Sequence, residues 1–295
     1  MKVKIKILVL FTLIKLSVFS QTNQEYDFIG ALMLKNKSLI TYRIQFKIEN
    51  DVLNGFSYTD MQGKNETKSK ITGVYNEKKK IISIKESDII YTKSKELSDI
   101  FCFVNIEGKL KLKKNKNTIE GPFTGIYNNK DTCATGEVVL ISLKDAFIKF
   151  EKLTNKAGKI KKLDSVTKAK LNPDKFISKF NPNILKKDEV LSVFWKSNKF
   201  IIEIWDNGKE DGDLISLTHN KKTIFRKYEV KKEKRRIELD LIEGENIIEI
   251  LANNDGKIAP NTAKVILIDG DTEHLISTHL EAGKSSKINI IYKSN

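Results

Sequence analysis

The feature that most constrains this chain is a strict alternation of apolar and polar residues in its first half. The clearest stretch covers residues 40–48, where every even position is apolar and every odd position is polar. Successive side chains of a strand point to opposite faces, so this pattern predicts a strand with one buried and one solvated face. Shorter runs of the same kind lie at 56–58, 71–75, 81–84, 89–91, 100–104, 110–112, 119–127 and 138–141.

Pairs of turn-forming residues separate these runs. They are Asn50–Asp51, Gln62–Gly63, Asn76–Glu77, Glu107–Gly108 and Asn128–Asn129. Many short strands at this spacing, with no helix between them, are typical of an antiparallel meander. We therefore expect residues 21–144 to form an antiparallel β-domain, either a barrel or a sandwich.

The stretch 145–189 has a different pattern. Phe147, Phe150 and Leu153 recur at helical spacing, residues 160–166 repeat it, and Asn155 and Gly158 predict a break between two short helices. We expect a basic, partly helical connector here. A basic amphipathic helix can lie on anionic lipid, whereas a solvated helix packed against one neighbouring domain is the simpler interpretation.

Alternation returns over residues 190–295. Strands are expected at 200–205, 213–219, 223–230, 237–241, 246–252, 263–269, 274–279 and 287–292. Strands this numerous, with no helix between them, fit a β-sandwich of jelly-roll or immunoglobulin-like type. The whole chain is therefore expected to be all-β, apart from the connector.

Residues 1–20 have the pattern of a secretory signal peptide. Three lysines form the charged start, residues 7–14 form the apolar region, and Val18 and Ser20 are small enough for a cleavage site before Gln21. A membrane anchor would need about 20 apolar residues, and Lys15 interrupts the run. We expect an exported protein of the periplasm, the outer surface or the medium, with no transmembrane segment in the mature chain.

The two cysteines, Cys102 and Cys133, both fall in the first β-domain. An oxidising compartment favours a disulfide between two cysteines of one small domain. Two buried free thiols are the alternative. A catalytic thiol is disfavoured, because the first domain contains no histidine that could activate it.

The basic charge of the chain does not indicate a nucleic-acid partner. Of the formal net charge of +15, four positives (Lys2, Lys4, Lys6 and Lys15) belong to the leader. Only four of the 53 basic residues are arginine, the residue that reads bases and clamps phosphates bidentately. A Lys-rich, Arg-poor exported chain is expected to have a solvated surface and to bind no nucleic acid.

Sequence motifs for catalysis are missing. There is no P-loop, dinucleotide-binding glycine pattern, nucleophile elbow or zinc-protease motif. His274 and His279 are five residues apart, which on a strand places them on opposite faces, and His219 is the third histidine. No catalytic residue can therefore be named, and an enzyme is disfavoured.

One acidic segment stands out between two expected strands, at residues 205–213. Asp206, Asp211 and Asp213 are its candidate calcium ligands, with Glu210 and Asn207 as lesser contributors, because dense carboxylates near glycines can surround a hard cation. The alternative is an acidic turn whose side chains bond their own backbone. A structural calcium ion is the one cofactor that the sequence suggests.

The same half of the chain resembles a β-sandwich module found at the C-terminus of exported proteins of Gram-negative bacteria. Five blocks carry the resemblance, in order, within residues 198–293: 205–206, 210–213, 244–246, 252–256 and 260–263. The module has no established activity, so the resemblance implies location and fold rather than function. The first domain resembles no family that we can name.

Two β-domains behind a leader, without a catalytic motif, indicate a non-catalytic binding or interaction protein of the envelope. A glycan, a small apolar ligand inside an open barrel and an envelope protein are the partners considered. Trp195, Trp205 and Tyr228 are the aromatic residues that could stack on a sugar, although aromatic residues on strands are usually core. The alternative is an envelope hydrolase with a carboxylate-based site.

Overall fold

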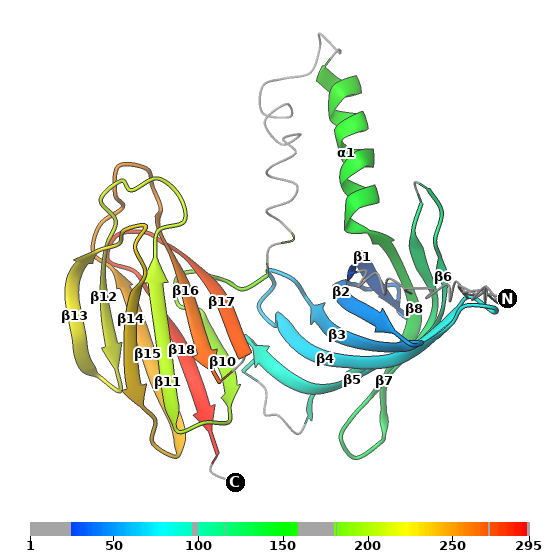
Figure 1. Ribbon diagram of the computed structural model, residues 1–295, viewed down its shortest axis with the longest axis horizontal. Helices are drawn as coiled ribbons and strands as arrows, with labels where there is room; N and C mark the ends of the chain where they lie inside the picture. Colours follow the sequence, from blue (N-terminus) through cyan, green and yellow to red (C-terminus); the bar gives the residue numbers. More distant parts are fainter. Residues whose placement is uncertain are drawn as a thin grey trace, which may run out of the picture.

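The computed structural model describes residues 25–95, 100–114, 116–158, 180, 182–270 and 272–293. Within these ranges the chain is almost entirely β-structure, with one short helix, which confirms the predicted all-β fold. Figure 1 shows a barrel and a sandwich side by side, with the helix standing out from the barrel. The predicted signal peptide lies outside the described residues.

Eight antiparallel strands form the barrel in a simple meander. They are β1 (Glu25–Leu34), β2 (Leu39–Glu49), β3 (Val52–Thr59), β4 (Thr67–Asn76), β5 (Ile81–Thr92), β6 (Phe103–Lys111), β7 (Thr118–Ile126) and β8 (Thr132–Ser142). Each strand pairs with the next, and β1 also pairs with β8, which closes the barrel.

The alternation over residues 40–48 has the predicted consequence. Tyr42, Ile44 and Phe46 on β2 are buried inside the barrel, where they join inward-facing residues of all the other strands in one apolar cluster. The interior of the barrel is therefore a packed core rather than an open ligand cavity.

The turn at Asn50–Asp51 is confirmed, with both residues at positive φ between β2 and β3. The predicted turn at Glu107–Gly108 is wrong, because both residues lie within β6. A Cβ atom on Gly121 of β7 would lie 2.7 Å from the Gly108 Cα. Glycine serves here for the close approach of two strands rather than for a turn.

The predicted strands 81–84 and 89–91 are one strand, β5, rather than two. The polar residue between them, Glu86, did not mark a turn. Its carboxylate is buried and accepts hydrogen bonds from the Tyr42 hydroxyl at 2.8 Å and from the Val104 N–H at 2.7 Å. A satisfied buried carboxylate can stay within a strand.

The predicted disulfide between Cys102 and Cys133 is present, with Cα atoms 6.0 Å apart. It joins the chain just before β6 to β8, and β7 lies between those two strands. The bridge passes over Gly125 of β7, where a Cβ atom would come within 2.3 Å of Cys102 Sγ and 3.0 Å of Cys133 Sγ. Only glycine leaves room for this crossing.

The helix α1 (Leu143–Gly158) follows β8 directly. Ser142 and Asp145 cap its N-terminus: the Asp145 N–H donates to Ser142 Oγ, and the Ser142 hydroxyl donates to the Asp145 carboxylate. The helix continues through Asn155 and ends at Gly158, the other residue named for the expected break, and the second predicted helix lies outside the described residues. No described helix is long and apolar enough to cross a membrane.

Ten further strands build the sandwich. They are β9 (Ile184–Leu185), β10 (Val190–Trp195), β11 (Lys199–Trp205), β12 (Leu214–His219), β13 (Lys222–Glu229), β14 (Arg235–Asp240), β15 (Gly244–Ala252), β16 (Asn261–Asp269), β17 (Thr272–Leu280) and β18 (Ser285–Tyr292). One layer has the order β13-β12-β15-β18-β10, and the other has the order β14-β11-β16-β17-β9. Their inward-facing residues form the second apolar core.

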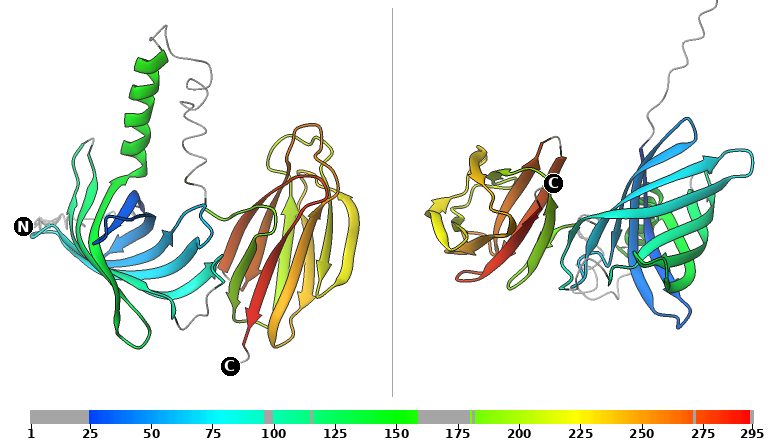
Figure 2. Two further views of the ribbon diagram at one scale, coloured as in Figure 1. Left: turned by 180° about the vertical axis from the view of Figure 1, so that it is seen from behind. Right: turned by 90° about the horizontal axis from the view of Figure 1, so that it is seen from below.

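The strand β5 connects the two bodies. Its first half, residues 81–85, pairs with β6 inside the barrel, whereas Tyr91 and Thr92 pair with Val193 and Ser192 of β10. The strand therefore leaves one neighbour and gains another, so that the barrel and one layer of the sandwich form a continuous thirteen-stranded sheet. Figure 2 shows this junction from behind and from below.

Candidate functional site

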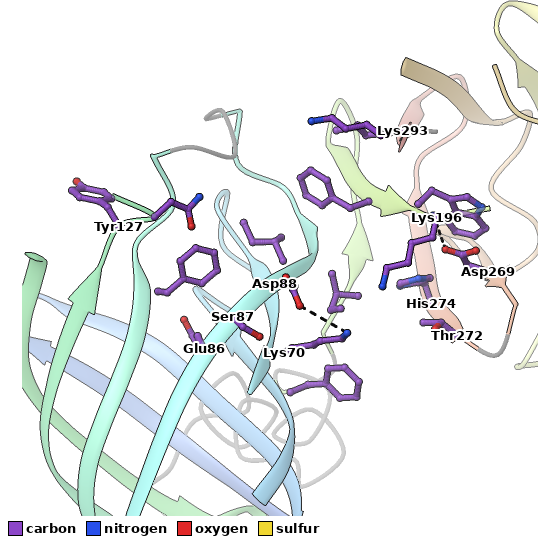
Figure 3. A pocket seen from close by; sticks show the side chains of 18 of the residues that line it. Lys70, Glu86, Ser87, Asp88, Tyr127, Lys196, Asp269, Thr272, His274 and Lys293 are labelled. Carbon is purple, nitrogen blue, oxygen red and sulfur yellow. Dashed lines mark hydrogen bonds and ion pairs between the residues drawn. The ribbon is translucent and has the colours of Figure 1, made fainter. Parts of the chain in front are cut away.

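A large groove lies at this junction, where β5 separates from β6 and meets β10. Its volume of about 1010 Å³ is at the upper end of the range for pockets that hold small organic ligands (about 300–1,000 Å³). Residues of β3–β7 form the barrel side, and residues of β10 and β16–β18 form the sandwich side. Figure 3 shows Lys70 and Asp88 on the first side and Lys196 and His274 on the second.

Eight apolar side chains line the groove. They are Phe56, Ile89, Ile90, Phe103, Ile126, Phe194, Trp195 and Ile291. Phe103 is half-buried and belongs to neither apolar core. It is therefore a surface that a ligand can cover without disturbing the fold.

Charged residues surround this apolar wall. On the barrel side, Asp88 pairs with Lys70, with 3.9 Å between carboxylate and ammonium. On the sandwich side, Asp269 accepts the backbone N–H of Lys196 at 2.9 Å. The ammonium groups of Lys196 and Lys293 form no ion pair among the described residues, so the groove has cationic groups available to a ligand.

Glu86 also borders the groove. Both of its oxygens accept hydrogen bonds from the barrel, and burial raises the pKa of its carboxyl group. The side chain thereby links β5 to β2 and β6, and its oxygens are already engaged by Tyr42 and Val104.

The three aromatic residues considered for sugar stacking are covered. Trp195 is buried against Phe200, and its indole N–H donates to the Lys199 carbonyl. The Lys234 ammonium lies 4.7 Å from the centroid of the Trp205 ring, and the Arg235 guanidinium lies 4.3 Å from that of Tyr228. Cations on these ring faces occupy the surface on which a sugar would stack.

The acidic segment 205–213 links β11 to β12 at one end of the sandwich. Asp206, Asp211 and Asp213 are all buried. Asp206 Oδ1 accepts the Gly208 N–H at 2.6 Å, which is the side-chain-to-backbone turn expected for such a segment. The other two carboxylates bond residues that are more than forty positions away.

Asp211 and Asp213 hold the loop between β15 and β16. Asp211 Oδ2 accepts the Ile258 N–H at 2.8 Å, and Asp213 Oδ2 accepts the Thr262 N–H at 2.8 Å. The remaining oxygen of each carboxylate approaches Gly256: a Cβ atom there would lie 2.5 Å from Asp213 Oδ1 and 2.8 Å from Asp211 Oδ1. The structure thus brings two of the three predicted carboxylates to one point.

Asn254 and Asn261 complete this network. The Leu214 N–H donates to Asn254 Oδ1, while the Asn254 amide donates to the Gly212 carbonyl and the Asn261 amide donates to the Leu214 carbonyl. Three of the five sequence blocks behind the family resemblance therefore meet at one end of the sandwich. Their local role is to tie two loops together.

The residue types that commonly bind metals are scattered over the described chain. Among the residues that the structure describes, no three His, Cys, Asp or Glu side chains form a group that could hold a metal ion. His274 is buried and His279 is exposed on β17, which confirms that they lie on opposite faces. Burial raises the pKa of Asp213, and the neighbouring charges of Asp211 and Asp206 raise it further.

Comparison with known proteins found no matching family model, curated protein or solved structure. The site must therefore be interpreted from its own chemistry. The sequence identified the acidic segment, because its carboxylates are adjacent in the chain. It missed the groove, because Phe103 and Phe194 lie on strands far apart in the chain, and each looks like an ordinary strand residue.

Proposed function

We propose that this protein is an exported, non-catalytic binding protein of the bacterial envelope that holds an amphipathic ligand in the groove between barrel and sandwich. The ligand would have an apolar body and an anionic group. The observation that carries the proposal is the combination of a large, partly apolar groove with two lysines on its edge that form no ion pair with a carboxylate of the described residues.

The distribution of charge favours an anionic head group. The acidic residues on the edge, Asp88 and Asp269, are engaged by Lys70 and by the Lys196 N–H. The Lys196 and Lys293 side chains are exposed at the groove. A second groove of about 710 Å³ shares Phe56 and Lys70 with the first, so a long apolar chain has a surface along which to continue.

The other partners receive less support. The rings of Trp195, Trp205 and Tyr228 are covered, which disfavours glycan stacking. An envelope hydrolase would need a carboxyl group free to exchange protons with its substrate, and both oxygens of Glu86 are engaged by the barrel.

Export is part of the proposal. It is supported by the pattern of residues 1–20 and by the disulfide, which is typical of oxidising compartments. N-terminal sequencing of the protein recovered from the periplasm or medium should begin at Gln21. An exported form that keeps Met1 would contradict this part.

A fluorescent long-chain carboxylic acid and its methyl ester are suitable probes for the groove. We expect saturable binding of the acid, and we expect Phe103→Ala to weaken it about tenfold, which corresponds to about 1.4 kcal/mol of lost apolar contact. Val139→Ala is the matched control, because Val139 is an exposed apolar residue outside the groove. Binding that is unchanged in Phe103→Ala would refute the groove as the site.

The charge on the groove edge can be tested separately. The double variant Lys196→Ala/Lys293→Ala should weaken binding of the acid while leaving binding of the ester unchanged, because only the acid has a charge to lose. Equal weakening of both probes would show that the lysines act through packing, and no binding of either probe would reject an amphipathic ligand.

A further inference from the structure

We propose that Asp211 and Asp213 form a calcium site at the end of the sandwich, distinct from the groove. The site would use the two carboxylate oxygens that approach Gly256. The calcium site can be tested without an assay of the protein's function. If the test fails, the proposal for the groove is not affected.

The first observation is the position of the two oxygens. Asp211 Oδ1 and Asp213 Oδ1 both lie within 2.8 Å of the point where a Cβ atom on residue 256 would stand. Residue 256 is glycine at φ +62°, a conformation that favours glycine, and any side chain there would collide with both oxygens, so glycine is what allows the two carboxylates to converge beside it. The opposite oxygens are fixed by the Ile258 and Thr262 N–H groups, which orient both carboxylates.

The second observation is a buried oxygen without a partner. Asp213 is only 2% exposed, yet its Oδ1 accepts no hydrogen bond. Buried carboxylate oxygens are normally satisfied, and one that is not indicates an unseen donor or ion. This oxygen is the same one that faces Asp211 across the Gly256 position.

The third observation is the missing counter-charge. Neither Asp211 nor Asp213 forms an ion pair with a lysine or arginine among the described residues, and Asp206 adds a further negative charge nearby. Two carboxylates brought together in a buried place repel each other unless a cation or a shared proton intervenes. A cation would remove the repulsion.

Calcium fits this set better than other metals. The side-chain ligands are oxygens alone, with no histidine or cysteine, which suits hard cations. Calcium accepts irregular arrangements of six to eight oxygens, and main-chain carbonyls or water can supply the remainder. Because only two carboxylates take part, we expect the weak affinity of extracellular calcium modules, with a Kd of about 10⁻⁴–10⁻³ M.

The experiment uses the full mature chain and two probes, Ca²⁺ and Tb³⁺. Trp205 immediately precedes Asp206, so excitation of tryptophan should sensitise Tb³⁺ luminescence, and millimolar Ca²⁺ should quench it by competition. Ca²⁺ at 10 mM should also raise the melting temperature by a few degrees, since a ligand that binds only the native state stabilises it. Asp213→Asn and Asp211→Asn should abolish both signals.

Asp240→Asn is the matched control, because Asp240 is an exposed carboxylate on β14 and should leave both signals intact. If the wild-type chain shows neither sensitised luminescence nor thermal stabilisation, the proposal is wrong, whether or not the variants fold. A second outcome would also contradict the proposal. If calcium has no effect on the wild-type chain and Asp213→Asn is more stable than the wild-type chain without calcium, the two carboxylates share a proton instead.

Discussion

The backbone N–H of Asn183 donates to Glu66 Oε1 at 2.6 Å, which joins the chain entering the sandwich to the loop between β3 and β4 of the barrel. The same carboxylate accepts the Tyr91 hydroxyl at 3.0 Å and the Gln62 N–H at 2.6 Å. Nearby, the buried Lys93 ammonium donates to the Ile184 carbonyl and to Glu189. The two bodies are therefore fixed to each other by buried polar bonds as well as by the pairing of β5 with β10.

Replacing Glu66 should loosen this junction. Glu66→Ala removes the acceptor of three donors, and buried donors without partners cost about 1–3 kcal/mol each, so we expect a loss of several kcal/mol of stability. Chemical denaturation should show the loss, and limited proteolysis should show faster cleavage near residue 183. Glu66→Gln keeps one acceptor oxygen and should lose less. Equal stability of Glu66→Ala and the wild-type chain would show that the junction depends on strand pairing alone.

Gly125 should be required for the disulfide that crosses β7. Gly125→Ala places a methyl group only 2.3 Å from Cys102 Sγ, so the bridge or the strand must move. The bridge closes a loop over a sequence separation of 31, which is worth up to about 3.7 kcal/mol in the chain-entropy model. Thermal unfolding should show that Gly125→Ala is strongly destabilising.

A variant without the disulfide provides the control for this prediction. In the double variant Cys102→Ser/Cys133→Ser, we expect Gly125→Ala to cost less, because the smaller hydroxyl groups need not approach each other over β7. An equal cost in both backgrounds would mean that Gly125 matters for the strand itself rather than for the crossing.

His274 should make the protein sensitive to acid. Burial, together with the Lys68 charge, lowers the pKa of this imidazole to about 4, although the Asp269 charge acts in the opposite direction. The unfolded chain binds the proton at about pH 6.5, so stability is present above pH 6.5 and is lost as the pH falls toward 4. His274→Phe should reduce the loss of unfolding free energy between pH 7 and 4.5 by on the order of 2 kcal/mol.

His279→Phe is the matched control for His274, because His279 lies on the same strand and is exposed. Denaturant titrations at several pH values should show a smaller change for this variant. Identical pH profiles for His274→Phe and the wild-type chain would contradict the assignment.

Local pattern was sufficient to predict most of the strands. Tyr42, Ile44 and Phe46 lie inside the barrel because side chains of a strand alternate between faces, whatever the rest of the chain does. The prediction was wrong at Glu107–Gly108, since a glycine that allows two strands to approach has the same local pattern as a glycine in a turn. The sequence pattern predicts residues 81–84 and 89–91 as separate strands for a similar reason: a polar residue such as Glu86 stays within a strand only when it has partners, and the folded chain alone reveals them.

The candidate sites divide in the same way. Density of charge along the chain pointed to Asp211 and Asp213, but their shared neighbour Gly256 lies more than forty residues later and enters only through the fold. The groove has no local signal at all. Trp195 continues an apolar alternation and Phe103 stands next to Val104 at the start of a strand, and the space beside them exists because β5 changes partners between β6 and β10.

Glu86 should affect stability with the opposite dependence on pH. Burial raises the pKa of its carboxyl group above the unfolded value of 4.5, so its contribution is fully present below pH 4.5 and is lost as the pH rises through the folded-state pKa. Glu86→Gln imitates the protonated form: its amide can donate to the Tyr42 oxygen while its carbonyl accepts the Val104 N–H. We therefore expect this variant to gain stability over the wild-type chain as the pH rises from 4.5 to 8.

Glu86→Ala is the control for this prediction. It leaves both partners of Glu86 unsatisfied and should be destabilised throughout the range from pH 4.5 to 8. Chemical denaturation of the three proteins at several pH values in this range measures their free energies of unfolding. If the difference between Glu86→Gln and the wild-type chain stays constant over the range, Glu86 keeps an ordinary pKa at the edge of the groove, which contradicts the prediction.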